Sequence, residues 1–144
     1  PVGFLSYGKE RYHLPPSTGS SHFDRTMEIL AQAQSGDDKK LHQILNEERN
    51  IWINYTSIIV ITPSNNIEWV SALSELTQLN INITVILIDP ISFSGDGDQT
   101  EVISALASIG ISPFLLRKGD SMEAALSRSF SRADSSKLAG LSSR

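Results

Sequence analysis

The sequence predicts an α/β fold, a doubly wound three-layer sandwich with a mainly parallel sheet between two layers of helices. The main observation is the Ile-Ile-Val-Ile run at residues 58–61. Four successive β-branched residues are typical of a parallel strand that is buried on both faces. The apolar run at residues 83–88 has the same character. Strand and helix patterns alternate from Ile58 onward, which indicates parallel strands joined by right-handed helical crossovers.

The N-terminal part of the chain predicts a β-hairpin followed by helices. Residues 2–7 form one strand pattern and residues 11–14 a second one, which the adjacent prolines Pro15 and Pro16 should end. The spacing of apolar residues predicts a helix over residues 21–34. A second helix, which we expect Asp37 and Asp38 to cap, carries Leu41, Ile44 and Leu45.

The C-terminal part predicts the remaining elements of the sandwich. A helix opened by Asn66 carries an apolar stripe, and a polar loop over residues 91–98 leads to another helix that Gly110 closes. Pro113 near the start of a short apolar run indicates an edge strand. Asp120 or Ser121 should cap a last helix.

Length and composition limit the domain organisation and the partners. The 144 residues suit one domain over residues 1–131 and a Ser-rich flexible tail over residues 132–144, which has too little apolar content to pack firmly. Twelve Lys and Arg oppose sixteen Asp and Glu without a basic cluster, which argues against nucleic acid as a partner. The chain has no cysteine, so it has no disulfide, thiolate nucleophile or cysteine zinc site.

Polar residues follow the strand at residues 58–61 directly. Thr62, Ser64, Asn65 and Asn66 lie where the strand ends, and in open α/β sheets this carboxyl end is where ligands or partners bind. An alternative is that Asn65 or Asn66 simply caps the next helix, since Asn is a leading cap residue. The sequence leaves both interpretations open.

Three other patterns fall short of a recognised chemistry. The glycines and aspartates at residues 95–100 match neither a dinucleotide fingerprint nor a calcium loop in spacing. Ser20, Ser21, His22 and Asp24 contain the residue types of a hydrolase triad, but neighbours at one helix start cannot align as nucleophile, base and orienting acid. Histidine spacing gives no support to a zinc site.

Four segments together resemble a known family. Residues 2–8, 14–23, 58–62 and 85–90 look like the later part of a von Willebrand factor A-like domain, closest to the bacterial family known as domain of unknown function fifty-eight. The resemblance runs from Val2 to Phe130. It implies a Rossmann-like fold of which the first strand is absent from this chain.

The resemblance also bears on metal binding. Many such domains hold magnesium with an Asp-x-Ser-x-Ser loop after the first strand, a Thr before a later helix and an Asp after the fourth strand. Here the loop is absent, Ser21 aligns with the Thr, and Pro63 or Ser64 replaces the Asp. Because a hard cation needs anionic oxygen ligands, we expect no metal and no cofactor, with magnesium only in the full-length family pattern.

The implied function is protein binding. Relatives of this kind are bacterial proteins with transmembrane helices ahead of a soluble, cytoplasmic-side domain, often encoded beside MoxR-type AAA+ ATPases. We therefore expect a protein-binding or assembly module that is not an enzyme, with a MoxR-type ATPase as the candidate partner. The expected contact face comprises Ser20, Ser21, Thr62, Ser64 and Asn65. The alternative is a small-molecule- or divalent-metal-dependent enzyme that uses the same crevice.

The absent first strand predicts open strand edges. In the family's strand order it would lie between residues 2–7 and residues 58–62, so both strands lose a neighbour. Unpaired apolar edges favour pairing with another chain. We expect either closure of the two strands against each other or a homodimer formed by strand or helix exchange.

Overall fold

The structure is a computed structural model that describes residues 1–36 and 39–127. The chain divides into two compact units, Pro1–Lys40 and Leu41–Arg144, and each is considered by itself. The tail expected over residues 132–144 and the caps expected at Asp37 and Asp38 lie outside the described residues.

The first unit is a β-hairpin with a helix. Strands β1 (Val2–Tyr7) and β2 (Arg11–Ser17) pair antiparallel, and α1 (Ser20–Gln32) follows. The expectation that Pro15 and Pro16 end the second strand is wrong, because β2 continues to Ser17. A two-stranded hairpin tolerates proline because the outer side of each strand makes no ladder bond and so needs no backbone N–H. The register of the pair also shifts beside the two prolines.

Helix α1 uses one side to contact the hairpin. The Nε2 atom of His22 lies 2.6 Å from the carbonyl oxygen of Val2, and Ile29 is buried. A second apolar stripe of Phe23, Met27 and Leu30 is exposed. Helical spacing places these three residues on one face, so α1 presents apolar surface on two sides.

The second unit contains a parallel sheet. Strands β3 (Ser57–Thr62), β4 (Asn82–Ile88) and β5 (Phe114–Leu116) lie side by side in that order. Both crossovers advance in one direction, so right-handed connections place their helices on the same face.

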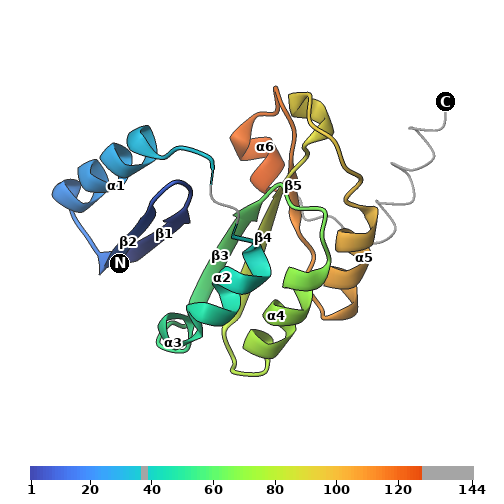
Figure 1. Cartoon of the computed structure of the whole chain (residues 1–144), viewed down its shortest axis with the longest axis horizontal. Coiled ribbons are helices and arrows are strands. Elements are labelled where there is room, and N and C mark those ends of the chain that lie inside the picture. Colours follow the sequence, from blue (N-terminus) through green and yellow to red (C-terminus); the bar gives the residue numbers. More distant parts are fainter. Residues whose placement is uncertain (37–38, 128–144) are drawn as a thin grey trace. The chain divides into compact units, whose positions relative to one another are not determined.

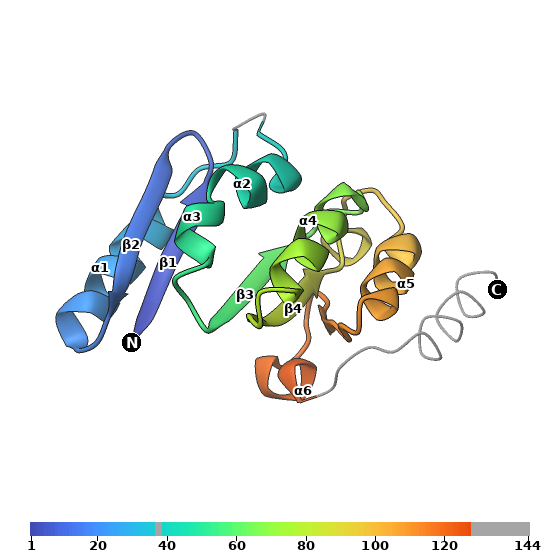
Figure 2. The same cartoon turned by 90° about the horizontal axis from the view of Figure 1, so that it is seen from below.

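Helices flank this sheet. The crossover helices are α4 (Glu68–Thr77) and α5 (Thr100–Ser108), while the short α6 (Met122–Leu126) contacts β5 from the other side (Figures 1 and 2). This mixed α/β arrangement is compatible with a Rossmann-like fold.

Two helices precede the sheet. Helix α2 (Leu41–Glu47) packs on α4, and the single turn α3 (Arg49–Trp52) follows it. The indole Nε1 of Trp52 donates to the carbonyl oxygen of Leu45 at 3.1 Å. The core of the unit lies between the sheet and this helical layer, and its fully buried residues include Trp69, Leu73, Val85, Leu87, Val102 and Leu106.

The prediction that β3 is buried on both faces is wrong. Ile58, Val60 and Thr62 are buried, but Ile59 and Ile61 are 64% and 62% exposed. The reason lies in the second helical layer: α6 has only five residues and contacts β5, at the far side of the sheet. Burial on both faces requires a cover that β-branched residues cannot supply themselves.

Candidate functional site

The loops at the carboxyl end of the sheet form the candidate site. Parallel strands end at the same edge, so the loops after β3, β4 and β5 share it (Figure 1). The loop after β4 contains a short 3-10 helix, η1 (Ile91–Phe93). This edge corresponds to the position where α/β sheets bind ligands or partners.

Side chains of the loop after β3 hold its own backbone. The hydroxyl Oγ1 of Thr62 accepts from the amide of Ser64 at 3.1 Å, and the hydroxyl Oγ of Ser64 accepts from the amide of Asn66 at 3.3 Å. The Oδ1 atom of Asn66 then accepts from the amide of Glu68 at 2.9 Å. Such local bonds are typical of Ser, Thr and Asn in turns and caps. The capping alternative is therefore confirmed for Asn66.

Asn65 contacts the loop after β4 instead. Its carboxamide lies so close to the backbone of Gly97 that a Cβ atom at position 97 would collide with it. Gly97 also has a φ of 117°, which side-chain-bearing residues rarely adopt. The positive φ is the main reason that glycine is favoured at this position, because the Asn65 side chain could move away from a Cβ atom.

Gln99 joins the ends of β3 and β4. Its side chain is buried, and Nε2 donates to the carbonyl oxygens of Pro63 at 3.1 Å and Ile88 at 3.2 Å. One carboxamide therefore donates to two backbone acceptors at the ends of neighbouring strands, one just after β3 and one in the last residue of β4. This role of Gln99 could not be predicted from the sequence, because a single Gln before a helix carries no local signal of such a bond.

Asp98 fixes the start of α5. Its Oδ1 atom accepts from the amide and the hydroxyl of Thr100, at 2.9 Å and 2.6 Å. These hydrogen bonds to Thr100, the side-chain bond first, lower the pKa of the Asp98 carboxyl. The carboxylate that resembled a calcium ligand in the sequence serves as a helix cap.

The loop after β4 is fixed by a further set of bonds. Asp89 Oδ1 accepts from the amide of Ile91 at 3.1 Å, and the hydroxyl of Ser92 donates to the Asp89 carbonyl at 2.8 Å. The amide of Lys118, after β5, donates to the same Ser92 hydroxyl at 2.9 Å. Asp89 Oδ2 lies 3.6 Å from Nε of Arg117. This loop is thus tied to the end of the neighbouring strand.

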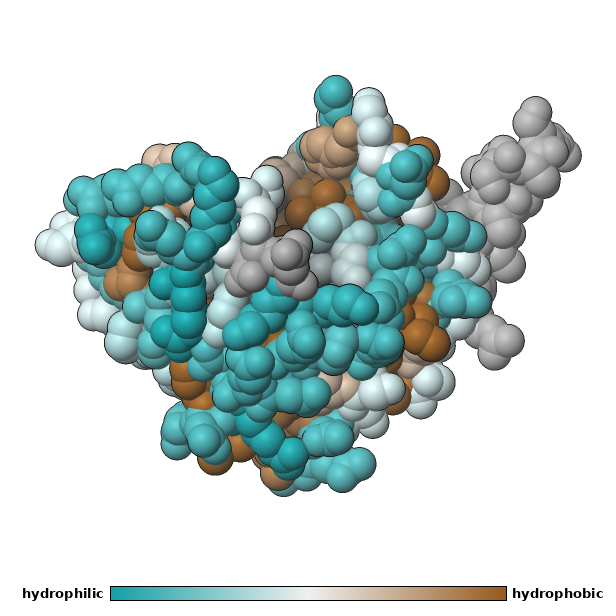
Figure 3. Space-filling model, in the orientation of Figure 1, coloured by the Kyte–Doolittle hydropathy of each residue, from teal (hydrophilic) through white to brown (hydrophobic). Residues whose placement is uncertain are grey.

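Large apolar side chains are exposed on these fixed loops. Ile91 and Phe93 of η1 are 62% and 49% exposed, and Ile67, before α4, is 46% exposed. We call these three residues the strand-end surface. Apolar residues appear in this part of the second unit in Figure 3. This surface was not predicted from the sequence, in which residues 91–98 have the pattern of a polar loop.

The five predicted contact residues divide between the two units. Thr62, Ser64 and Asn65 lie together at the end of β3, although Thr62 is buried. Ser20 and Ser21 are exposed at the start of α1 in the first unit. Gly19 precedes them with a φ of 99° and no side-chain cap bond is made there.

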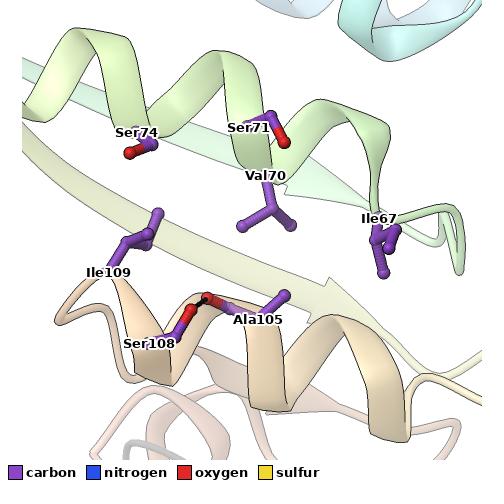
Figure 4. Close-up of a pocket in the computed structure, with 7 residues that line it drawn as sticks. All are labelled: Ile67, Val70, Ser71, Ser74, Ala105, Ser108 and Ile109. Atoms are coloured by element: carbon purple, nitrogen blue, oxygen red, sulfur yellow. Dashed lines mark hydrogen bonds between the residues drawn. The ribbon is translucent and has the colours of Figure 1, made fainter.

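A shallow groove lies between α4 and α5. Its volume is about 270 Å³, and it is lined by Ile67, Val70, Ser71, Ser74, Ala105, Ser108 and Ile109 (Figure 4). The Ser108 hydroxyl donates to the carbonyl of Ala105 at 2.6 Å. The lining thus offers hydroxyl groups and apolar surface but contains no acid or base, so general acid–base chemistry has no group to use there.

Comparisons with known proteins do not identify a family for this chain. No protein-family model, curated protein or solved structure matches it significantly. Within residues 1–36 and 39–127, no three His, Asp or Glu side chains gather as a metal site would need. No helix of that part of the chain is long and apolar enough to cross a membrane.

Proposed function

We propose that this chain is a protein-binding module that contacts its partner through the strand-end surface and catalyses no reaction. The observation that carries the proposal is the exposure of Ile91 and Phe93 on a loop that Asp89, Ser92 and Lys118 hold by hydrogen bonds. Protein interfaces draw most of their binding energy from a few large side chains. A loop that is already fixed loses less conformational entropy on binding.

The charges around the surface suit a protein interface. Arg117 and Asp89 lie beside η1 and are only partly exposed, and Ser64 and Asn65 extend the polar rim at the end of β3. A polar rim around apolar anchors is the usual anatomy of a protein–protein contact. In this proposal Thr62 shapes the loop and does not touch the partner.

The family and the partner belong to the same proposal. The resemblance to von Willebrand factor A-like domains suggests a bacterial membrane protein with this domain on the cytoplasmic side and a MoxR-type AAA+ ATPase as its partner. The parallel sheet flanked by helices is compatible with that family's Rossmann-like fold. The carboxylates Asp89 and Asp98 support a binding role, since both accept backbone amides and so shape loops.

Binding to a purified MoxR-type ATPase tests the proposal. We expect Phe93→Ala to weaken binding at least tenfold by calorimetry, because truncating a hot-spot side chain costs about 2 kcal/mol or more and the proposal makes Phe93 such an anchor. Ile53→Ala is the matched control, since Ile53 is 51% exposed and lies beyond α3, before β3 begins. Equal affinity of Phe93→Ala and the unmodified chain would refute the proposal that the strand-end surface contacts the partner. If the unmodified chain does not bind at about 100 µM, an order-of-magnitude limit for transient complexes, the proposed partner is wrong.

A further inference from the structure

Strand β3 has an open edge. In the described residues of the second unit it pairs with β4 alone, and the sheet ends on its other side. Its sequence, Ser-Ile-Ile-Val-Ile-Thr, contains no charge and no proline, and its pairing with β4 runs without a bulge. Natural edge strands normally carry a charge, a proline or a bulge, because these features prevent pairing with another chain.

The opposite edge of the same sheet is protected. Strand β5 has only three residues, follows Pro113 and contacts α6. Short length and proline are among the usual devices for blunting an edge. The contrast identifies β3 as the edge that remains available for pairing.

The side chains of β3 define what would fit beside it. Ile59 and Ile61 are exposed on the face that α6 leaves open, whereas Ile58 and Val60 are buried under the crossover helices. A strand added to this edge must therefore carry apolar residues on the open face, beside Ile59 and Ile61. It must also carry apolar residues on the opposite face, which the crossover helices cover. Strand β3 of a second copy meets both requirements.

We propose that β3 pairs antiparallel with β3 of a second copy of this chain across a two-fold axis. Residues directly opposite in such a pair must lie on the same face of the sheet. A register centred on Val60 then places Ile59 opposite Ile61 of the other copy, twice. A register centred on Ile59 would instead place Ile61 opposite Ser57. The first register matches four exposed isoleucines and is the one we infer.

The size of the contact sets its strength. Six residues at ~3.3 Å each give an edge only about 20 Å long, so pairing of this one strand buries less surface than the roughly 800 Å² per partner of a standard interface. We therefore expect a weak dimer with a dissociation constant of about 10⁻⁴ M that separates on dilution. This inference uses a different edge from the strand-end surface and does not rest on the proposed function.

Disulfide trapping tests the register directly. The chain has no cysteine, so Ile59→Cys and Ile61→Cys introduce one thiol each. The two variants, carrying tags of different size, are mixed and oxidised. Opposite residues have Cα atoms about 5 Å apart, within disulfide range, whereas two copies of residue 59 would be about 8 Å apart. We expect the mixed 59–61 product to dominate. Mainly homotypic products would overturn the register. No crosslink at millimolar concentration would overturn the dimer.

A charge at the edge tests the association. Ile61→Lys should lower the dimer fraction at least tenfold in analytical ultracentrifugation between about 10 µM and 1 mM, with unchanged circular dichroism, since a lysine on an edge strand opposes pairing. Leu79→Lys, which replaces another exposed apolar residue after α4, is the control and should dimerise like the unmodified chain. An unmodified chain that stays monomeric over this range, or equal effects of both substitutions, would refute the proposal.

Discussion

Gln99 offers the sharpest test of how the strand ends are held. Replacing it by Met keeps the length of the side chain but removes Nε2, so the carbonyls of Pro63 and Ile88 lose their donor. Each of the two hydrogen bonds contributes about 0.5–1.5 kcal/mol. Pro63 is exposed and Ile88 is only partly buried, so water can take the place of the lost donor. We expect Gln99→Met to lower the free energy of unfolding by about 1–3 kcal/mol. That is a large part of the ~5–15 kcal/mol typical of a domain.

Urea unfolding followed by circular dichroism measures this loss. Gln99→Glu is the matched variant, because it keeps the shape and replaces the donor by a carboxylate that faces two carbonyl oxygens. Burial and the nearby oxygens raise the pKa of such a carboxyl in the folded state. Its destabilisation should therefore be largest at pH 7 and shrink as the pH falls through that raised pKa, when the protonated acid can donate again. A change of less than 0.5 kcal/mol in Gln99→Met, the usual scatter for a surface site, would refute the reasoning.

Three further predictions address β3, metal and acid. Val60→Asp should prevent folding because Val60 is buried. Ile61→Asp, at the exposed neighbouring position, should change the free energy of unfolding in urea by less than about 1 kcal/mol. Equal effects of the two substitutions would show that the two faces of β3 are wrongly assigned. Millimolar Mg²⁺ should leave the melting temperature unchanged, and a rise of several degrees that Ser21→Ala abolishes would contradict this. Because hydrogen bonds lower the pKa of Asp98 in the folded state, its contribution is present above pH ~4 and is lost as pH falls below it. Asp98→Asn should flatten the acid side of the stability profile, and an unchanged profile would argue against that linkage.

Local pattern predicted the elements of the second unit well. Strands β3, β4 and β5 and helices α4 and α5 occur where hydrophobic periodicity and the glycine and proline signals indicated. These signals act between residues close in the chain. The two faces of β3 could not be predicted in the same way, because the exposure of Ile59 depends on where α6 packs.

The candidate site was predicted only in its position. The carboxyl end of β3 could be located from Thr62 and the polar residues after it. The part played by Gln99 depends on a bond to Pro63, 36 residues away in the chain, and a contact of that separation leaves no trace in a single sequence. The exposed Phe93 was missed for a related reason, since its exposure follows from how the loops after β4 and β5 are bonded together.

The parallel sheet also determines how early the second unit can begin to fold while the chain is being synthesised. A hairpin such as β1–β2 can form as soon as both strands exist, within microseconds. Strand β3 must wait for β4, which starts about 20 residues later in the chain, and a ribosome adding ~5–20 residues per second needs roughly one to four seconds for that length. During this interval an uncharged β-branched strand has no partner within its own chain. Nascent copies on neighbouring ribosomes can then supply one, so an aggregation hazard exists before the sheet has formed.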